Sequence, residues 1–264
     1  MTLQLQYKGF INTPNLWLSD RFGLHQYTLS KELIIFSEQL KTKEKRLGKR
    51  VEDYFQFQIN NTENTRLVAS NLQVKKDKIT IGELDALIIE NRTPKHIEIT
   101  YKFYLFNPNI EGSYIHKWIG PNLKDSLIYK LEKIKEKQLP LLYYEYAKHT
   151  LKQLKLDTKT IEQNVCFKAQ LFIPYKTNVK VNPLNQNCIY GFYFNYAQLP
   201  LFKDCMFYIP SKLDWLVEPH YDVDWITYNK TIIEIGHIIT SKRSPMVWIK
   251  NDDEEITKSF ITFW

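Results

Sequence analysis

This chain of 264 residues is poor in cysteine and glycine and has no long hydrophobic run. Its three cysteines, Cys166, Cys188 and Cys205, are odd in number and far apart, and no Cys-x-x-Cys pair occurs. This usage argues against a disulfide framework and a thiolate zinc site, and it is typical of a reducing compartment. With only 8 glycines and 11 prolines, the chain is not a fibrous or low-complexity sequence.

Segments that would direct the chain into a membrane are also missing. No stretch approaches the roughly 18 continuous apolar residues of a membrane span. The N-terminal sequence MTLQLQYKGF lacks the charged start and apolar run of a signal peptide. The G-x-x-x-x-G-K-[ST] and G-x-S-x-G patterns are absent, so a P-loop protein or an α/β-hydrolase has no support. We therefore expect a cytoplasmic protein without a membrane partner.

The chain is rich in apolar and aromatic side chains and carries excess positive charge. It is 44% hydrophobic and 14% aromatic, which is enough to bury a substantial core. The net charge of +7 favours an anionic partner such as nucleic acid. Six basic residues between Lys41 and Arg50 could contact phosphates, although a solvated helix face is the simpler explanation.

Hydrophobic periodicity predicts the order helix, three strands, helix, strand in the first two thirds of the chain. Before this pattern, residues 1–30 look like turns flanking short apolar pieces. The expected elements are a helical period from Glu32 through Phe55, strands at 67–74, 79–89 and 96–105, a helix introduced by Gly120-Pro121, and a strand at 165–174. Short aromatic strands, including 226–240, are expected afterwards. We predict an α/β core with a mixed sheet over residues 1–176, and a β-rich C-terminal portion over 177–264 packed on it.

The two strands within residues 81–105 place acidic side chains in register. Glu83 and Asp85 are two residues apart on the first strand, so both project from one face. On the second strand Glu98, Thr100 and Lys102 share a face, and apolar residues fill the other. Because the first strand is otherwise apolar on both faces, its carboxylates need a partner, a metal ion or a raised pKa.

The αβββαβ order and these motifs resemble the PD-(D/E)XK (restriction-endonuclease-like) nuclease superfamily, including its Holliday-junction resolvase branch. The matching residues are Gly82-Glu83-Leu84-Asp85 and Ile97-Glu98. Over most of its length the chain also resembles a bacterial family, domain of unknown function 1853. That resemblance is carried by RLGKRVEDYFQF, GELDALII, KFYL, WIGPNLKDSL and KEKQLPL.

The resemblance to the nuclease superfamily implies a divalent-metal site. It makes Asp85 and Glu98 the metal ligands and Lys102 the catalytic cation. Glu52 corresponds to the acidic residue that the first helix of this fold often contributes, and Glu83 is a less certain additional ligand. Oxygen ligands of this kind suit Mg²⁺ or Mn²⁺. Such an ion would polarise the scissile phosphate and lower the pKa of a bound water.

The sequence departs from the superfamily pattern at two positions. Leu84 stands where a proline usually precedes the aspartate, and Thr100 stands where the lysine usually follows the glutamate. Lys102 keeps the same strand face but lies about 6.6 Å farther along, from a rise of about 3.3 Å per residue. This displacement weakens the catalytic role of Lys102 more than it weakens the metal site.

Two functions follow from these residues. The leading hypothesis is a metal-dependent nuclease that hydrolyses DNA or RNA, with the C-terminal portion supplying substrate selection or a homodimer surface. The alternative is a non-catalytic nucleic-acid-binding or scaffold protein that keeps the nuclease-like fold. An ordinary strand pair with solvated charges explains Glu98 and Lys102 without any site, since such pairs stabilise by only a few tenths to about one kcal/mol.

Overall fold

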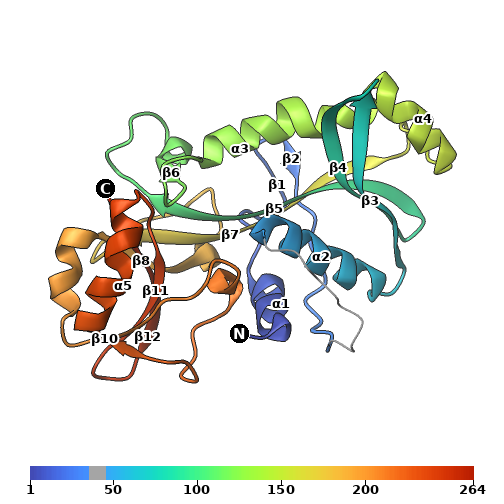
Figure 1. Ribbon diagram of the computed structural model, residues 1–264. Coiled ribbons are helices and arrows are strands. Elements are labelled where there is room, and N and C mark those ends of the chain that lie inside the picture. Colours follow the sequence, from blue (N-terminus) through green and yellow to red (C-terminus); the bar gives the residue numbers. More distant parts are fainter. Residues whose placement is uncertain (36–45) are drawn as a thin grey trace.

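The computed structural model of the protein describes residues 1–35 and 46–264 and contains a large mixed sheet with helices on both faces (Figure 1). The α-helices in these ranges are α1 (Leu3–Asn12), α2 (Leu47–Asn60), α3 (Leu127–Lys133), α4 (Glu145–Gln153) and α5 (Tyr228–Thr240). A π-helical turn at Ile134–Gln138 and a 3₁₀ turn at Leu139–Tyr143 extend α3. The remaining 3₁₀ turns are Tyr114–Lys117, Gln186–Cys188, Tyr196–Phe202 and Asp214–Leu216.

The main sheet has the strand order β10-β9-β11-β12-β8-β7-β5-β4-β3, and β6 pairs separately with β5. The strands are β3 (Thr65–Lys76), β4 (Ile79–Glu90), β5 (Thr93–Phe106), β6 (Trp118–Ile119), β7 (Glu162–Pro174), β8 (Ile189–Asn195), β9 (Met206–Tyr208), β10 (Ile226–Thr227), β11 (Met246–Lys250) and β12 (Ile256–Thr262). A separate hairpin consists of β1 (Asp20–Arg21) and β2 (Leu24–His25).

The sheet has a parallel centre flanked by antiparallel strands on both sides. The strands β3, β4 and β5 pair antiparallel, whereas β5, β7, β8 and β12 pair in parallel. The mixed α/β class predicted from the sequence is therefore confirmed at this level. The pairing of β7 with β8 carries the sheet across residue 176, and the division of the chain at that residue stays a prediction.

Alternation along β5 divides the core between the two faces of the sheet. Ile97, Ile99, Tyr101 and Phe103 join the cluster that packs against α1 and α2. Tyr104 instead joins the cluster that packs against α3. Figure 1 shows α3 on one side of β5 and β7, with α1 and α2 on the opposite side. Side chains of β5 therefore reach two helical layers.

The predicted strands at 67–74, 79–89, 96–105 and 165–174 fall within β3, β4, β5 and β7. The prediction for residues 226–240 was wrong, because only Ile226–Thr227 is a strand and α5 follows it. In α5, Thr231 and Ile235 are buried one turn apart while Ile233 is 72% exposed. A helical face thus explains the isoleucines, and their packing overrides the β-propensity of branched side chains.

The N-terminal residues were also read incorrectly, because Leu3–Asn12 is a helix rather than a series of turns. The side chain of Thr2 caps it by accepting a hydrogen bond from the Leu5 amide. In contrast, no helix begins at Glu32, since residues 31–35 have no regular secondary structure. The predicted continuation over 36–45, including three of the six basic residues of the run, lies outside the described residues.

The helix predicted after Gly120-Pro121 begins later, at Leu127. Ser126 is its N-cap, and the Ser126 hydroxyl accepts a hydrogen bond from the Tyr129 amide at 3.3 Å. Pro121 instead belongs to a turn. Its own carbonyl oxygen accepts hydrogen bonds from the side chains of Ser244 and Trp264. The C-terminal residues thus anchor this turn against the first part of the chain.

Among the helices that the structure describes, none is long and apolar enough to cross a bilayer. Cys166, Cys188 and Cys205 are all free thiols, as expected from their spacing.

Gly9 is the glycine of α1 that permits a close backbone contact. A Cβ atom at this position would lie 1.9 Å from the Leu216 carbonyl oxygen, whereas one at Gly236 in α5 would meet nothing within 4 Å.

We expect Gly9→Ala to lower the free energy of unfolding by about 2–4 kcal/mol, through overpacking against backbone. Gly236→Ala should raise it by up to about 1 kcal/mol, from helix propensity. Urea unfolding of both variants tests this contrast, and equal effects would contradict it.

Candidate functional site

The site begins where β4 separates from β5. Backbone pairing of these strands runs from Glu90 and Thr93 to Ala86 and Ile97 and then stops. At the next position the Asp85 side chain, rather than the β4 backbone, accepts the Ile99 amide at 2.9 Å. Since β6 pairs only with the far end of β5, the intervening stretch of β5 has a free edge. Its opposite edge remains paired with β7 throughout.

Asp85 and Glu98 meet at this point of divergence. The negative charge of Glu98 acts on Asp85, so ionising both carboxyl groups at once is unfavourable. Burial and, to a smaller extent, the negative charge of Glu98 raise the pKa of Asp85 to about 7. Burial likewise raises the pKa of Glu98, which is 1% exposed, to about 7. Removal of both protons therefore needs a compensating positive charge.

Neighbouring side chains fix the orientation of the Glu98 carboxylate. His96 Nδ1 accepts a hydrogen bond from Gln163 at 3.1 Å, so its Nε2 carries the proton and donates to Glu98 Oε1 at 3.0 Å. Burial lowers the pKa of His96 to about 4, which keeps the ring neutral. Gln138 Nε2 donates to the other oxygen, Glu98 Oε2, at 2.5 Å. Both carboxylate oxygens are thus held in place.

Among the cations near this carboxyl pair, Lys130 of α3 has the largest effect on the two pKa values. Its Nζ donates to Gln138 Oε1 at 2.8 Å, and Gln138 in turn contacts Glu98. The positive charge of Lys130 lowers the pKa of both Asp85 and Glu98 against the effect of burial. Burial also lowers the pKa of Lys130 itself. The π-helical turn at Ile134–Gln138 brings Gln138 within reach of Glu98, and such turns are frequent at functional sites.

Glu52 and Glu83 lie beside the pair, bridged by a lysine. Lys49 Nζ is 2.7 Å from Glu52 Oε2 and 2.6 Å from Glu83 Oε1. Burial raises the pKa of Glu52 to about 7, with Lys49 opposing this rise and the charge of Asp85 adding to it. The four acidic residues predicted from the sequence therefore come from three elements, α2, β4 and β5, and their charges act on one another. We call Glu52, Glu83, Asp85 and Glu98 the acidic cluster.

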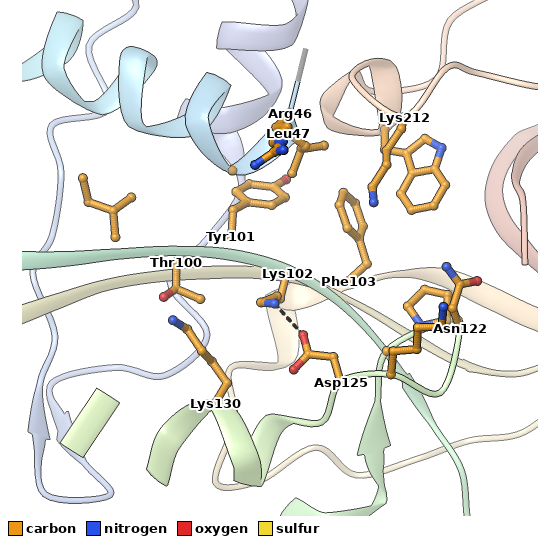
Figure 2. A pocket seen from close by; sticks show the side chains of 16 residues that line it. Arg46, Leu47, Thr100, Tyr101, Lys102, Phe103, Asn122, Asp125, Lys130 and Lys212 are labelled. Carbon is orange, nitrogen blue, oxygen red and sulfur yellow. Dashed lines mark hydrogen bonds and ion pairs between the residues drawn. The ribbon is translucent and has the colours of Figure 1, made fainter. Parts of the chain in front are cut away.

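Lys102 does not join the acidic cluster. Its Nζ pairs with Asp125 Oδ2 at 2.5 Å, on the same side of β5 as Thr100 (Figure 2). The cations whose charges act on Asp85 are Lys130 and Lys49. Lys102, two residues beyond the position that the superfamily pattern gives its lysine, thus lies farther along the free edge of β5. Its catalytic role stays a prediction.

The oxygen donors of the acidic cluster suit a hard cation, although no ready-made cage is present. Within residues 1–35 and 46–264, no three His, Cys, Asp or Glu side chains form a group that could hold a metal ion. Magnesium is commonly held by only one or two carboxylates together with waters and substrate phosphates. Asp85 and Glu98 meet that requirement, and Lys49 already places a positive charge between Glu52 and Glu83.

A pocket of about 620 Å³ opens along the free edge of β5, directly beside the acidic cluster. Figure 2 shows Thr100, Lys102 and Lys130 on one side of the strand, with Tyr101 and Phe103 on the other. The first turn of α2 and the Gly120–Asp125 turn complete the wall, together with Lys212 and Trp215. Lys130 lines this pocket and also acts on the acidic cluster, so it connects the two.

Sequence reasoning missed Lys130, Gln138 and His96. Lys130 is 28 residues beyond Lys102 in the sequence, and the acidic residues Glu132 and Glu136 near it are equally consistent with pairing within the helix. His96 did carry a usable signal, because it lies two residues before Glu98 and therefore on the same strand face. Lys49 lies three residues before Glu52, a spacing that indicates contact on a helix.

Neither a curated protein nor a solved structure matches this chain. A family described as a domain of unknown function, DUF1853, matches residues 24–259, which include α2, the acidic cluster, α3 and all strands that line the pocket. The match covers most of the chain, and we conclude that the protein is a member of the DUF1853 family.

Proposed function

We propose that this protein is a divalent-metal-dependent nuclease with a restriction-endonuclease-like core, hydrolysing phosphodiester bonds of DNA or RNA. The observation that carries the proposal is the pairing of half-buried Asp85 with buried Glu98 at the divergence of β4 and β5, next to a cationic pocket. Burying two carboxyl groups in contact is costly unless a proton or a cation compensates. Binding of a cation would offset this cost and so stabilise the folded protein.

In this proposal Asp85 and Glu98 would hold Mg²⁺ or Mn²⁺, and Glu52 and Glu83 would adjust to it through Lys49. The bound ion would supply Lewis-acid polarisation of the phosphate and a lowered pKa for a coordinated water. His96 and Gln138 would keep Glu98 in a fixed orientation, as partners of metal ligands commonly do. Lys130 would stabilise the negative charge that develops on the phosphoryl oxygens, and Lys102 would contact a phosphate farther along the pocket.

The assignment of Lys130 predicts a selective loss of activity. We expect Lys130→Met to lower the cleavage rate by about 100- to 1,000-fold, the range for removing one preorganised charge-stabilising donor. Metal affinity should hold or increase, because the variant removes a cation that competes for the carboxylates. Lys133→Met, an exposed position three residues later on α3, should leave the rate unchanged. Equal rates for both variants and wild type would remove Lys130 from the mechanism.

The function itself is tested by incubating the protein with single-stranded DNA, duplex DNA and RNA in Mg²⁺, in Mn²⁺ and with chelator. Metal-dependent shortening of at least one substrate is expected, with no shortening in chelator. Binding of metal and nucleic acid without any cleavage across this panel would favour the non-catalytic alternative, a nucleic-acid-binding or scaffold protein. The pairing of Lys102 with Asp125, away from the acidic cluster, is the observation on the side of that alternative.

A further inference from the structure

We propose that the pocket along the free edge of β5 binds one unpaired nucleotide, so that the substrate is single-stranded nucleic acid. The base would lie against Trp215, and the phosphates would lie on the pocket cations next to Asp85 and Glu98. This inference rests on the proposed nuclease function and names the substrate class for the same site.

The charge of the pocket matches a phosphodiester backbone. The pocket is lined by five cationic side chains and one carboxylate. The cations are Arg46, Lys102, Lys124, Lys130 and Lys212, and the carboxylate is Asp125. Within the part of the chain that the structure describes, only Lys102 among these five forms an ion pair. Lys130 Nζ donates to Gln138, and Arg46, Lys124 and Lys212 have no ion-pair partner among the described residues, so these three can meet an anion. Phosphate contacts of this kind supply most of the sequence-independent affinity for nucleic acid.

Polar groups of the strand itself also face the pocket without a partner. The Thr100 hydroxyl is buried, with the residue 4% exposed, and no hydrogen-bond partner for it exists among the described residues. Figure 2 shows Thr100 on the same side of the strand as Lys130. The Ile99 amide points to the free edge, toward Asp85, so alternation directs the amides of Tyr101 and Phe103 to that edge too. A bound phosphate or sugar would satisfy these donors.

Trp215 gives the pocket a rigid aromatic wall. Phe103 and Phe260 meet its indole ring at 87° in each case, so neither ring is stacked on it. Its backbone carbonyl accepts a hydrogen bond from the buried Lys258 ammonium at 2.8 Å, which fixes the turn that carries it. Lys212 Nζ lies 5.9 Å from the ring centroid. An aromatic side chain with a cation beside it is the usual platform for an unpaired base.

The size of the pocket favours a single nucleotide over a continuous duplex. Its volume of about 620 Å³ falls in the range of about 300–1,000 Å³ that holds small molecules. A base inside a duplex is stacked and offers no free face to Trp215, whereas an unpaired base does. The Gly120–Asp125 turn and Trp215 flank the pocket, so a strand would have to present a nucleotide between them.

Fluorescence anisotropy in chelator tests this proposal, because it measures binding without cleavage. The probe is a labelled thymidine oligonucleotide of about 12 nucleotides, within the site sizes of single-strand binders, and the competitor is a blunt duplex of equal length. The single strand should bind at least about ten-fold more tightly than the duplex. Trp215→Leu should weaken single-strand binding about ten-fold without changing its salt dependence, and Tyr129→Leu, an exposed aromatic of α3 outside the pocket, should not.

The lysines give a second, independent readout in the event that Trp215→Leu does not fold. Lys124→Ala with Lys212→Ala should reduce the slope of log affinity against log salt by about 1.4, at about 0.7 for each lost contact. Lys152→Ala, exposed on α4, should not change it. Equal affinity for single strand and duplex, or an unchanged salt slope in the lysine variant, would overturn the pocket assignment. Tight single-strand binding with no metal-dependent cleavage would instead refute the nuclease proposal alone.

Discussion

Asp85→Asn should abolish metal-dependent cleavage, lowering kcat/KM by at least about 1,000-fold. The substitution removes the negative charge that is proposed to hold the metal ion, but it keeps an oxygen able to accept the Ile99 amide. The junction between β4 and β5 should therefore persist. The loss should arise from chemistry rather than unfolding, which the cleavage rate and the far-ultraviolet circular dichroism spectrum measure together.

Asp77→Asn is the matched control for this variant. Asp77 is an exposed residue of the turn between β3 and β4, so the same chemical change is made eight residues before Asp85 and outside the site. Its cleavage rate should equal that of wild type within experimental error. If Asp85→Asn kept a tenth or more of the wild-type rate, the acidic cluster would not be the catalytic centre.

The metal-free protein should be destabilised at neutral pH by its own acidic cluster. The pKa values of Glu52, Asp85 and Glu98 are each raised to about 7 in the folded state, from about 4–4.5 when exposed. Between these limits the folded state binds more protons than the unfolded state, so stability falls as pH rises. Asp85→Asn should therefore be more stable than wild type by about 2–4 kcal/mol at pH 8, and by much less at pH 5.

The difference between wild type and variant is needed because other groups act in the opposite direction. Burial lowers the pKa of His96 to about 4 and that of Lys258 to about 7, so their contributions to stability increase with pH. Both are present in wild type and variant and largely cancel. The charged groups that act on Asp85, namely Glu52, Glu98, Lys49 and Lys130, also stay in place. A stability difference independent of pH, measured by urea unfolding, would contradict the raised pKa values.

Saturating Mg²⁺ should remove the advantage of the variant. A cation that binds the folded wild type stabilises it by mass action and has no corresponding effect on Asp85→Asn. The same urea experiment at pH 8 with and without Mg²⁺ separates this effect from general salt screening, for which Na⁺ at equal ionic strength is the control. Equal stabilisation of both proteins by Mg²⁺ would indicate binding elsewhere.

The acidic cluster could be predicted from the sequence because strand alternation is a strict local rule. Residues two apart in a regular strand share a face, and Thr100 and Lys102 do lie on one side of β5. The alignment of Asp85 with Glu98 followed from a short turn between two long apolar strands, which limits the possible registers.

The cation of the site could not be predicted in the same way. Lys130 comes from a helix whose position over the sheet depends on packing, and its sequence is equally consistent with pairing inside the helix. Gln138 reaches Glu98 only because the helix turns into a π-helical segment there, and no sequence signal for that turn was identified. Similarly, α5 was read as strand because its isoleucines favour strands locally, while burial of one helical face decided the outcome.

Calorimetric titration of Mn²⁺ into metal-free wild type and Asp85→Asn tests the central claim most directly, since it needs no substrate. At about pH 7 the account predicts one saturable site in wild type, with release of protons from carboxyl groups whose pKa values are near 7. It predicts at least ten-fold weaker binding in the variant, since one of the two carboxylates that hold the ion is lost. Equal affinity of the two proteins for Mn²⁺ would contradict the account, because the metal would then bind somewhere other than Asp85 and Glu98.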